Sequence, residues 1–129
     1  MLTTHVLDSI YPHTNKVAHG VEVPAGARYM FTNGQVGTRL DGTTPDSATE
    51  QSEEIFRRLG LILEAAGMSL ADVVRFTVYF TDRAYRDAFF AVRDRIMGDH
   101  KPGATILIIS GLARPELKIE VEAVAAKVD

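Results

Sequence analysis

The hydrophobic period of this chain changes along its length, and that change constrains the fold more than any other feature. In residues 47–66 apolar side chains recur every three or four positions, which predicts an amphipathic helix lying on a core. In residues 72–81 β-branched and aromatic side chains alternate with a period of two, which predicts a strand. A second helical stripe covers residues 83–97, and two apolar strands, 104–110 and 117–127, follow it. The chain is therefore expected to mix helices and strands.

The first third of the chain predicts short strands and turns. Strands are expected at Val17–Val23 and Arg28–Asn33, each followed by a turn signal. The Gly34–Gly37 segment is interpreted as a strand-to-loop turn, and Leu40–Asp46 as a polar loop. With the later elements this gives an α+β fold, in which two α-helices lie on one face of one mixed sheet of about six strands.

The first predicted helix carries clear terminal signals. Asp46 or Ser47 can cap its start, and Gly67 follows its last apolar residue. Two acid-first pairs at i,i+4 spacing, Glu53–Arg57 and Glu54–Arg58, are expected on its exposed side.

Two helices can cover one face of such a sheet, which leaves the other face open. The strand around residues 106–109 is apolar on both sides, as in a strand buried on both faces. An open apolar face predicts an oligomer. Phe90 and Met97 lie opposite the expected core stripe of the second helix, so they either contact another chain or are incidental exposed residues. That core stripe consists of Tyr85, Ala88, Phe89, Val92 and Ile96.

Composition excludes several classes of function. A length of 129 residues indicates a single domain spanning 1–129. The chain has no cysteine, which excludes thiolate nucleophiles, iron–sulfur clusters and cysteine-bound zinc. A net charge of −3, without a basic and aromatic stripe, argues against a nucleic-acid partner and hence against ribonuclease activity. No run approaches the roughly 20 apolar residues that span a bilayer, and residues 1–10 carry no secretory signal, so a cytoplasmic protein without a membrane partner is expected.

The four histidines do not predict a metal site. None is paired with another at i,i+4, and no acidic residue stands at ligand spacing from them. We interpret them as scattered surface or turn residues and expect no metal. They are His5, His13, His19 and His100.

Two carboxylates in the last strand are more informative. Glu120 and Glu122 are two residues apart, so they share one face of the sheet. Arg75 and Arg114 are candidate cations for that face. Two alternatives remain open: an exposed rim carrying two acids, or a pocket in which one glutamate has a raised pKa and moves a proton.

Three segments give the chain a resemblance to the Rid (YjgF/UK114) family over nearly its whole length. Leu117–Ala125, read as LKIEVEAVA, resembles the family signature. Asn33-Gly34-Gln35 corresponds to the family's Ser-Gly-Gln. Leu63–Asp72, followed by a strand and Thr81-Asp82, resembles the family's middle region.

The resemblance implies a chorismate-mutase-like (ferredoxin-like) fold and a homotrimer with three clefts between subunits. It implies a cofactor-free activity, the hydrolysis of reactive enamines and imines such as 2-aminoacrylate to a 2-oxo acid and ammonia. In the family an arginine holds the substrate carboxylate, for which a bidentate guanidinium is suited. By correspondence, Glu120 matches the glutamate associated with the attacking water, and Gly34, beside Asn33, matches a backbone contact to the substrate.

The sequence departs from the family at three cleft positions. Where the family has Pro-Ala-Arg-Ser, this chain has Pro-Gly-Ala-Thr at residues 102–105, so Ala104 occupies the position of the arginine. Ile106 stands where a cysteine is frequent, and Val17 where a tyrosine lines the cleft. The resemblance therefore places Ala104, Thr105 and Val17 in the substrate site without a cation, with Thr105 able to supply a hydroxyl.

Two functions follow from this resemblance. The first is a trimeric hydrolase or deaminase that acts on a small imine, enamine or related metabolite, with Glu120 orienting the water. Its substrate either lacks an α-carboxylate or is held by another cation. The second is a trimer that has lost the deaminase chemistry and serves as a small-ligand-binding or regulatory protein without catalysis.

Overall fold

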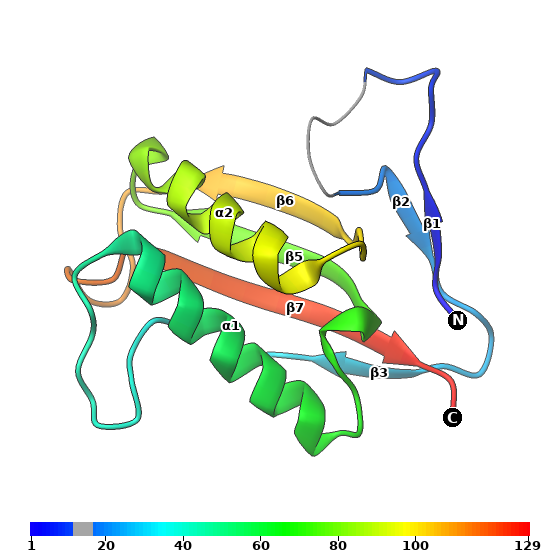
Figure 1. Ribbon diagram of the computed structural model, residues 1–129, viewed down its shortest axis with the longest axis horizontal. Coiled ribbons are helices and arrows are strands. Elements are labelled where there is room, and N and C mark those ends of the chain that lie inside the picture. Colours follow the sequence, from blue (N-terminus) through cyan, green and yellow to red (C-terminus); the bar gives the residue numbers. More distant parts are fainter. Residues whose placement is uncertain (12–16) are drawn as a thin grey trace.

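The computed structural model describes residues 1–11 and 17–129, so His13 lies outside the described residues. Both long helices lie over the same face of the main sheet, and the N-terminal hairpin stands apart from it (Figure 1). In chain order the strands and long helices are β1 (Thr3–His5), β2 (Gly20–Glu22), β3 (Arg28–Phe31), β4 (Gln35–Val36), α1 (Ala48–Ala65), β5 (Val73–Phe80), α2 (Arg86–Met97), β6 (Gly103–Ile108) and β7 (Ile119–Lys127). Two short 3-10 helices, η1 (Leu70–Asp72) and η2 (Arg83–Tyr85), precede β5 and α2.

The main sheet is mixed and has five strands. Its order is β3-β7-β5-β6, and β4 pairs with β7 beside β3. The β5–β6 pair is parallel, because α2 connects these strands, and the other pairs are antiparallel. β1 and β2 form a separate two-stranded sheet. The predicted α+β class, with two helices on one face, is confirmed, while the strands of the described residues divide between two sheets.

Helix α1 forms where the period predicted it. The Ser47 side chain accepts a hydrogen bond from the Glu50 amide at 3.0 Å, which caps the first turn. Gly67 follows the helix with a φ of 68°, a left-handed conformation that glycine adopts without strain. Within the described residues, no helix is both long and apolar enough to cross a membrane.

The core lies between the two helices and the sheet. Phe56 of α1 contacts Phe76 of β5 and Phe89 of α2, with ring centroids 5.8 and 5.6 Å apart. Phe80 meets Phe89 edge to face at 5.4 Å, and each of the four rings is at most 1% exposed. The β7 side chains on this face are Ile119, Val121, Ala123 and Ala125.

The predicted stripe of α2 is wrong at its C-terminal end. Met97 is buried, whereas Ile96 is 37% exposed. Phe90 packs partly against the core and lies under the Arg93 guanidinium, 4.5 Å from the ring centroid. The buried positions of α2 are 89, 92, 93 and 97, and burial of Arg93 is tolerated because Asp94 pairs with its charge at 2.8 Å. Phe90 and Met97 therefore do not form an exposed apolar surface.

A bulge in β5 changes which valine enters the core. The pairing with β7 shifts register between Val73 and Arg75, so Val74 is left out of the ladder. Val73 is fully buried in the core, where strict alternation had placed Val74. Beyond the bulge the predicted alternation is confirmed, with Phe76 on the helix side and Thr77 on the other.

β6 is an edge strand, so the prediction that it is buried on both faces is wrong. In the described sheet it pairs with β5 alone. Leu107 and Ile108 are 42% and 38% exposed. The apolar run therefore leaves hydrophobic side chains at an open edge rather than inside a sheet.

Candidate functional site

The face of the main sheet opposite the helices carries most of the polar candidates. Cross-strand partners share a face, and Tyr79 pairs with Glu120 while Thr77 pairs with Glu122. The predicted placement of the two acids on one face is confirmed. Tyr29 and Phe31 of β3 share this open face, and they are 55% and 72% exposed. The open face therefore combines carboxylates with large uncovered aromatic rings.

The Glu120 carboxylate lies directly against Gly34. A Cβ atom built on Gly34 would stand 1.9 Å from Oε2 of Glu120, far inside van der Waals contact. Position 34 therefore accepts no side chain unless Glu120 moves. Asn33 precedes the glycine in an exposed loop, and Val36 pairs with Glu120 across β4 and β7. The structure places Gly34 against Glu120, with Asn33 next to the glycine in the chain.

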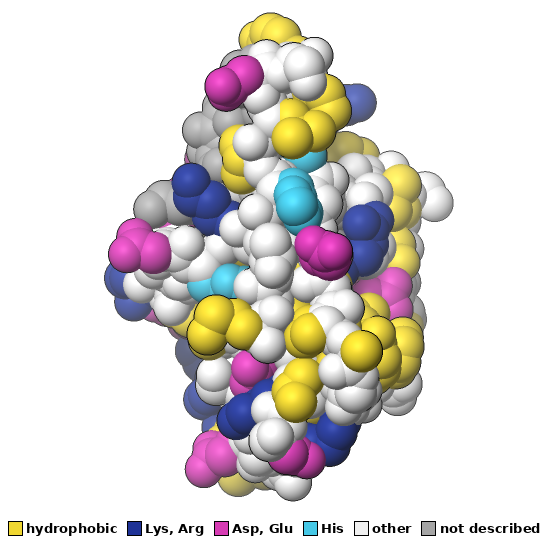
Figure 2. Space-filling model, turned by 90° about the vertical axis from the view of Figure 1, so that its right-hand side faces the viewer, with side chains coloured by type: hydrophobic (Ala, Val, Ile, Leu, Met, Phe, Trp, Pro, Cys, Tyr) yellow, Lys and Arg dark blue, Asp and Glu magenta, His cyan; other side chains and the backbone are white. Residues whose placement is uncertain are grey.

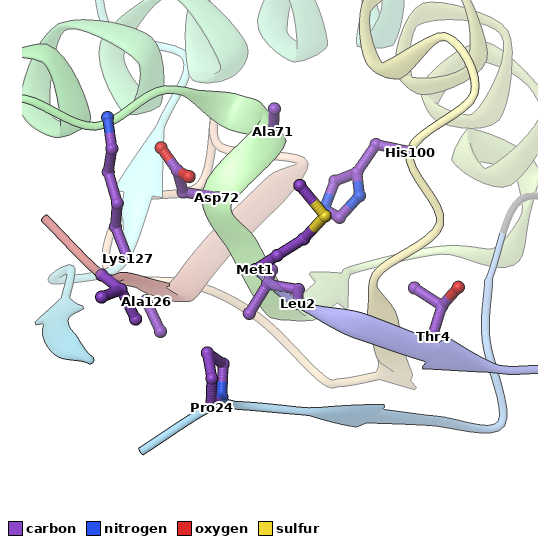
Figure 3. Close-up of a pocket in the computed structure, with 10 residues that line it drawn as sticks. Met1, Leu2, Thr4, Pro24, Ala71, Asp72, His100, Ala126 and Lys127 are labelled. Carbon is purple, nitrogen blue, oxygen red and sulfur yellow. The ribbon is translucent and has the colours of Figure 1, made fainter. Parts of the chain in front are cut away.

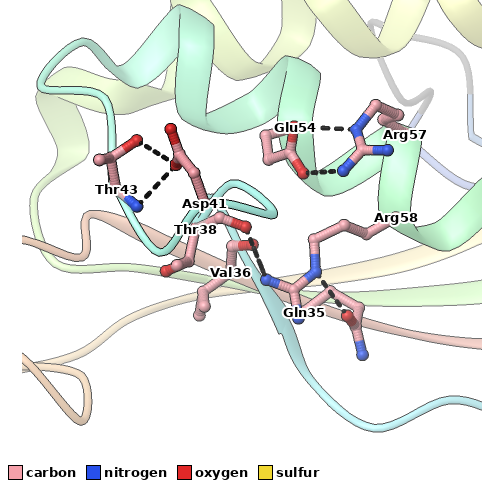
Figure 4. Close-up of polar contacts among 8 residues, drawn as sticks. All are labelled: Gln35, Val36, Thr38, Asp41, Thr43, Glu54, Arg57 and Arg58. Carbon is pink, nitrogen blue, oxygen red and sulfur yellow. Dashed lines mark hydrogen bonds and ion pairs between the residues drawn. The ribbon is translucent and has the colours of Figure 1, made fainter.

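Arg58 of α1 holds the segment that carries Gly34 (Figure 4). Its Nε donates to Oε1 of Gln35, and its Nη1 donates to the carbonyls of Val36 and Thr38, all at 3.0 Å. Gln35 in turn donates from Nε2 to the carbonyl of Asn33 at 3.1 Å. One guanidinium thereby fixes the loop against the helix and places the glycine under the carboxylate.

The predicted i,i+4 ion pairs of α1 do not form. Glu53 pairs instead with Arg95 of α2 at 3.0 Å, and Glu54 pairs with Arg57 at i,i+3, 2.6 Å away. This hydrogen bond from Arg57 lowers the pKa of the Glu54 carboxyl. Arg58 is free to turn inward, and helical spacing could not reveal its acceptors because they lie 20 to 23 residues away in the chain.

Tyr79 holds the second carboxylate. Its hydroxyl donates to Oε1 of Glu122 at 2.6 Å. That hydrogen bond raises the pKa of Tyr79, and burial and the charges of Glu122 and Glu120 raise it further. Among the described residues no side chain donates a hydrogen bond to the Glu120 carboxylate. Of the two acids, Glu120 is therefore the one left available to a ligand.

The remaining predicted residues lie near β6, on both of its faces. Thr105 lies on the open face and accepts a hydrogen bond from Nη2 of Arg75. Ala104 and Ile106 point the other way and pack against the hydrophobic core. Val17 lies beside the start of β6, where the Ala18 amide donates to the Pro102 carbonyl at 3.1 Å. Of the residues compared with the family's arginine segment, Thr105 rather than Ala104 shares the face of Glu120.

Within one chain the candidate residues form two separated groups. Glu120 is on β7 and Thr105 is on β6, with β5 between them. Thr105 pairs with Thr77, which pairs with Glu122, so two strand spacings and a two-residue offset separate the backbones of Thr105 and Glu120 by about 12 Å. Arg114, the other candidate cation, pairs with Glu116 and donates to the Thr38 hydroxyl instead. Within one chain these side chains therefore do not converge on one point.

A pocket of about 460 Å³ lies elsewhere, between the N-terminal hairpin and the end of β7 (Figure 3). Its titratable side chains are already bound to nearby backbone: His100 to the Val73 carbonyl at 2.7 Å, Asp72 to the Ser69 amide at 2.8 Å, and Lys127 to the Gly67 carbonyl at 3.1 Å. Figure 2 shows hydrophobic and charged side chains interspersed on this end of the molecule. The described residues contain no group of three or more side chains suited to a metal ion.

Comparisons with known proteins agree with this geometry. The family model described as Endoribonuclease L-PSP matches residues 13–127. The RutC family protein PH0854 of Pyrococcus horikoshii is 36% identical over 103 residues, covering 77% of this chain and 79% of that protein.

Solved structures show the same fold. The crystal structure of the Rid family protein YyfB from Yersinia pestis superposes with a TM-score of 0.87 at 26% identity, covering 98% of each chain. Rv2704 of Mycobacterium tuberculosis, a member of the YjgF/YER057c/UK114 family, has a TM-score of 0.68 at 25% identity over 97% of this chain and 98% of that one. The chain belongs to the Rid (YjgF/YER057c/UK114) family.

Proposed function

We propose that this protein is a cofactor-free hydrolase of a small reactive imine, enamine or related metabolite. It acts in the cytoplasm as a homotrimer, with its sites in clefts between subunits. The observation that carries the proposal is the Glu120 carboxylate lying against Gly34 on the open face, without a hydrogen-bond donor among the described residues. A carboxylate in that position is free to accept a proton from water.

The proposed reaction is an addition followed by an elimination. An enamine first tautomerises to its imine by gaining a proton at carbon and losing one from nitrogen. Water then adds to the C=N carbon: its oxygen bonds to that carbon, Glu120 accepts one of its protons, and the nitrogen takes up a proton from solvent. Glu120 then returns its proton to the amino group, the carbon–nitrogen bond breaks to release ammonia, and the hydroxyl loses its proton to solvent as the carbon–oxygen double bond of the oxo product forms.

The proposed trimer would join the two groups of candidate residues. In a single chain the backbones of Glu120 and Thr105 are separated by about 12 Å. The exposed side chains of Tyr29, Phe31 and Leu107 give the open face the apolar area that a subunit interface needs. A neighbouring copy seated on this face would cover these rings and bring its own β6 toward Glu120.

Two measurements test the proposal. Light scattering should give three times the 14.2 kDa mass of one chain, and a monomer would contradict the clefts. Purified protein should release ammonia from 2-aminoacrylate or from the imines that amino-acid oxidases generate. Glu120→Gln should abolish that release, whereas Glu64→Gln, which removes an exposed carboxylate from α1, should not. Equal activity in the two variants would exclude Glu120 as the base.

A specific observation favours the second function, a ligand-binding or regulatory trimer without catalysis. Ala104 packs against the core, so no cation comes from that position to the open face. If no imine is hydrolysed but a small metabolite raises the Tm, the binding function holds. A cation restored to the cleft should be introduced as Thr105→Arg, because Ala104→Arg would drive a guanidinium into the core.

A further inference from the structure

Four arginines have no carboxylate partner among the described residues, and of these only Arg75 lies on a strand of the main sheet; the others are Arg58, Arg83 and Arg86. Arg75 lies exposed on the open face and makes one polar contact, to the Thr105 hydroxyl. An arginine without an acid on a face that also carries two glutamates calls for an explanation. The arginines that do pair with a carboxylate are Arg28, Arg39, Arg57, Arg93, Arg95 and Arg114.

The surroundings of Arg75 leave its guanidinium accessible. Its cross-strand neighbours on the sheet are Gly103, which has no side chain, and Val124, which offers no acceptor. A guanidinium has five N–H donors, of which Thr105 takes one. Because the Thr105 oxygen accepts from Arg75, its own proton remains available to a ligand. The pair thus presents several donors and no negative charge.

The nearest acid in the register is held away from Arg75. Glu122 pairs with Thr77, one step along the same face. Its carboxylate accepts the Tyr79 hydroxyl at 2.6 Å, on the side away from Arg75. Tyr79 therefore prevents the internal ion pair that would otherwise neutralise the guanidinium.

We propose that Arg75 and Thr105 form a binding site for a small carboxylate. Two parallel N–H groups of the guanidinium match the two oxygens of a carboxylate, and the threonine hydroxyl adds a third donor. Arg75 pairs with Val124, four residues along β7 from Glu120, so the two sites of one chain are about 13 Å apart. The identification of this carboxylate as part of the substrate rests on the proposed function. The existence of the carboxylate site does not depend on that function.

The test uses pyruvate as the probe and uncharged pyruvamide as its control, with binding measured by calorimetry on the intact protein. Wild type should bind pyruvate and not pyruvamide. Arg75→Gln should weaken pyruvate binding by about tenfold or more, and Thr105→Val by a smaller factor. The matched control is Arg83→Gln, an exposed arginine of η2 without an ion pair among the described residues, and it should bind as wild type does.

Tyr79→Phe gives a second, indirect test. It releases Glu122 to pair with Arg75, so pyruvate binding should weaken although Tyr79 does not touch the ligand. The proposal is overturned if Arg75→Gln binds pyruvate as tightly as wild type, or if Arg83→Gln loses as much pyruvate affinity as Arg75→Gln. It is also overturned if Arg75→Gln changes the oligomeric mass, because Arg75 would then be an interface residue. Glu120→Gln separates the two proposals, because it should retain pyruvate binding even where ammonia release is lost.

Discussion

The two faces of the main sheet use the same strands for different purposes. On the helix side, side chains of β5 and β7 such as Phe76 and Val121 are at most 1% exposed. On the open side, alternate residues of the same strands carry Arg75, Tyr79 and Glu120, beside exposed rings of β3. The helix side stabilises the chain through burial, whereas the open side leaves charged and aromatic groups uncovered by the helices. Substitutions that differ only in the face they touch should therefore have different consequences.

The largest difference is expected between two phenylalanines. Phe89 is 1% exposed and contacts three other rings, so Phe89→Ala should lower the free energy of unfolding by about 3–5 kcal/mol. Phe31→Ala should leave the fold of the single chain intact because the ring is 72% exposed, but it should weaken association of the chains. Urea unfolding measures the first effect and light scattering the second. A similar loss of folding stability in both variants would contradict the division of the faces.

Two adjacent arginines of α1 give the next comparison. Arg58 donates to three acceptors of the loop beside Glu120, and Arg58→Met should cost about 1.5–3 kcal/mol by leaving those acceptors unsatisfied. Arg57 pairs with Glu54 at the surface, so Arg57→Met should barely move the urea midpoint. Ammonia release should fall in the Arg58 variant and persist in the Arg57 variant. Equal midpoints would show that the loop does not depend on Arg58.

Two glycines of one loop separate stability from chemistry. A Cβ on Gly37 would stand 2.7 Å from the Gln51 Cα, so Gly37→Ala should cost about 1–3 kcal/mol because helix backbone must move. A Cβ on Gly34 meets the flexible end of Glu120, so Gly34→Ala should unfold at nearly the wild-type urea concentration but lose ammonia release. Full activity in Gly34→Ala would contradict the role of the close contact.

The smallest effect is expected from pH. The hydrogen bond to Glu122 raises the pKa of Tyr79 above its ordinary value of 10.0. The stabilising contribution of this tyrosine is therefore fully present below about pH 10 and is lost as the pH rises through the folded-state pKa. Tyr79→Phe should make the decline of stability between pH 9 and 11 shallower, as measured by urea unfolding at each pH. An identical decline in both proteins would show that the hydrogen bond does not couple to folding.

Much of the fold was predictable because periodicity reports burial directly. The stripe of α1 and the alternation of β7 gave the right elements and placed Glu120 and Glu122 on one face. Prediction failed where burial depends on distant partners. The bulge at Val74 and the edge position of β6 follow from pairing with strands that are remote in the sequence. Neither leaves a local signal in the residues themselves.

Contiguous family motifs named two candidate residues that the structure places side by side. Gly34 and Glu120 were named from short motifs, and the structure brings them into contact. Arg58 was missed because its acceptors come from another segment, and Ala104 was grouped with Thr105 although consecutive strand residues point to opposite faces.

The sequence by itself determined the element types, the α+β class, the family and the carboxylates that share a face, since each depends on local period or on contiguous motifs. Tertiary structure alone decided that Arg58 turns inward and that the Tyr79 hydroxyl donates a hydrogen bond to Glu122. It also decided that Arg75 has no carboxylate partner among the described residues. Those choices depend on which groups of distant segments come within hydrogen-bond distance, and spacing along a chain does not encode distances between segments that pairing and packing bring together.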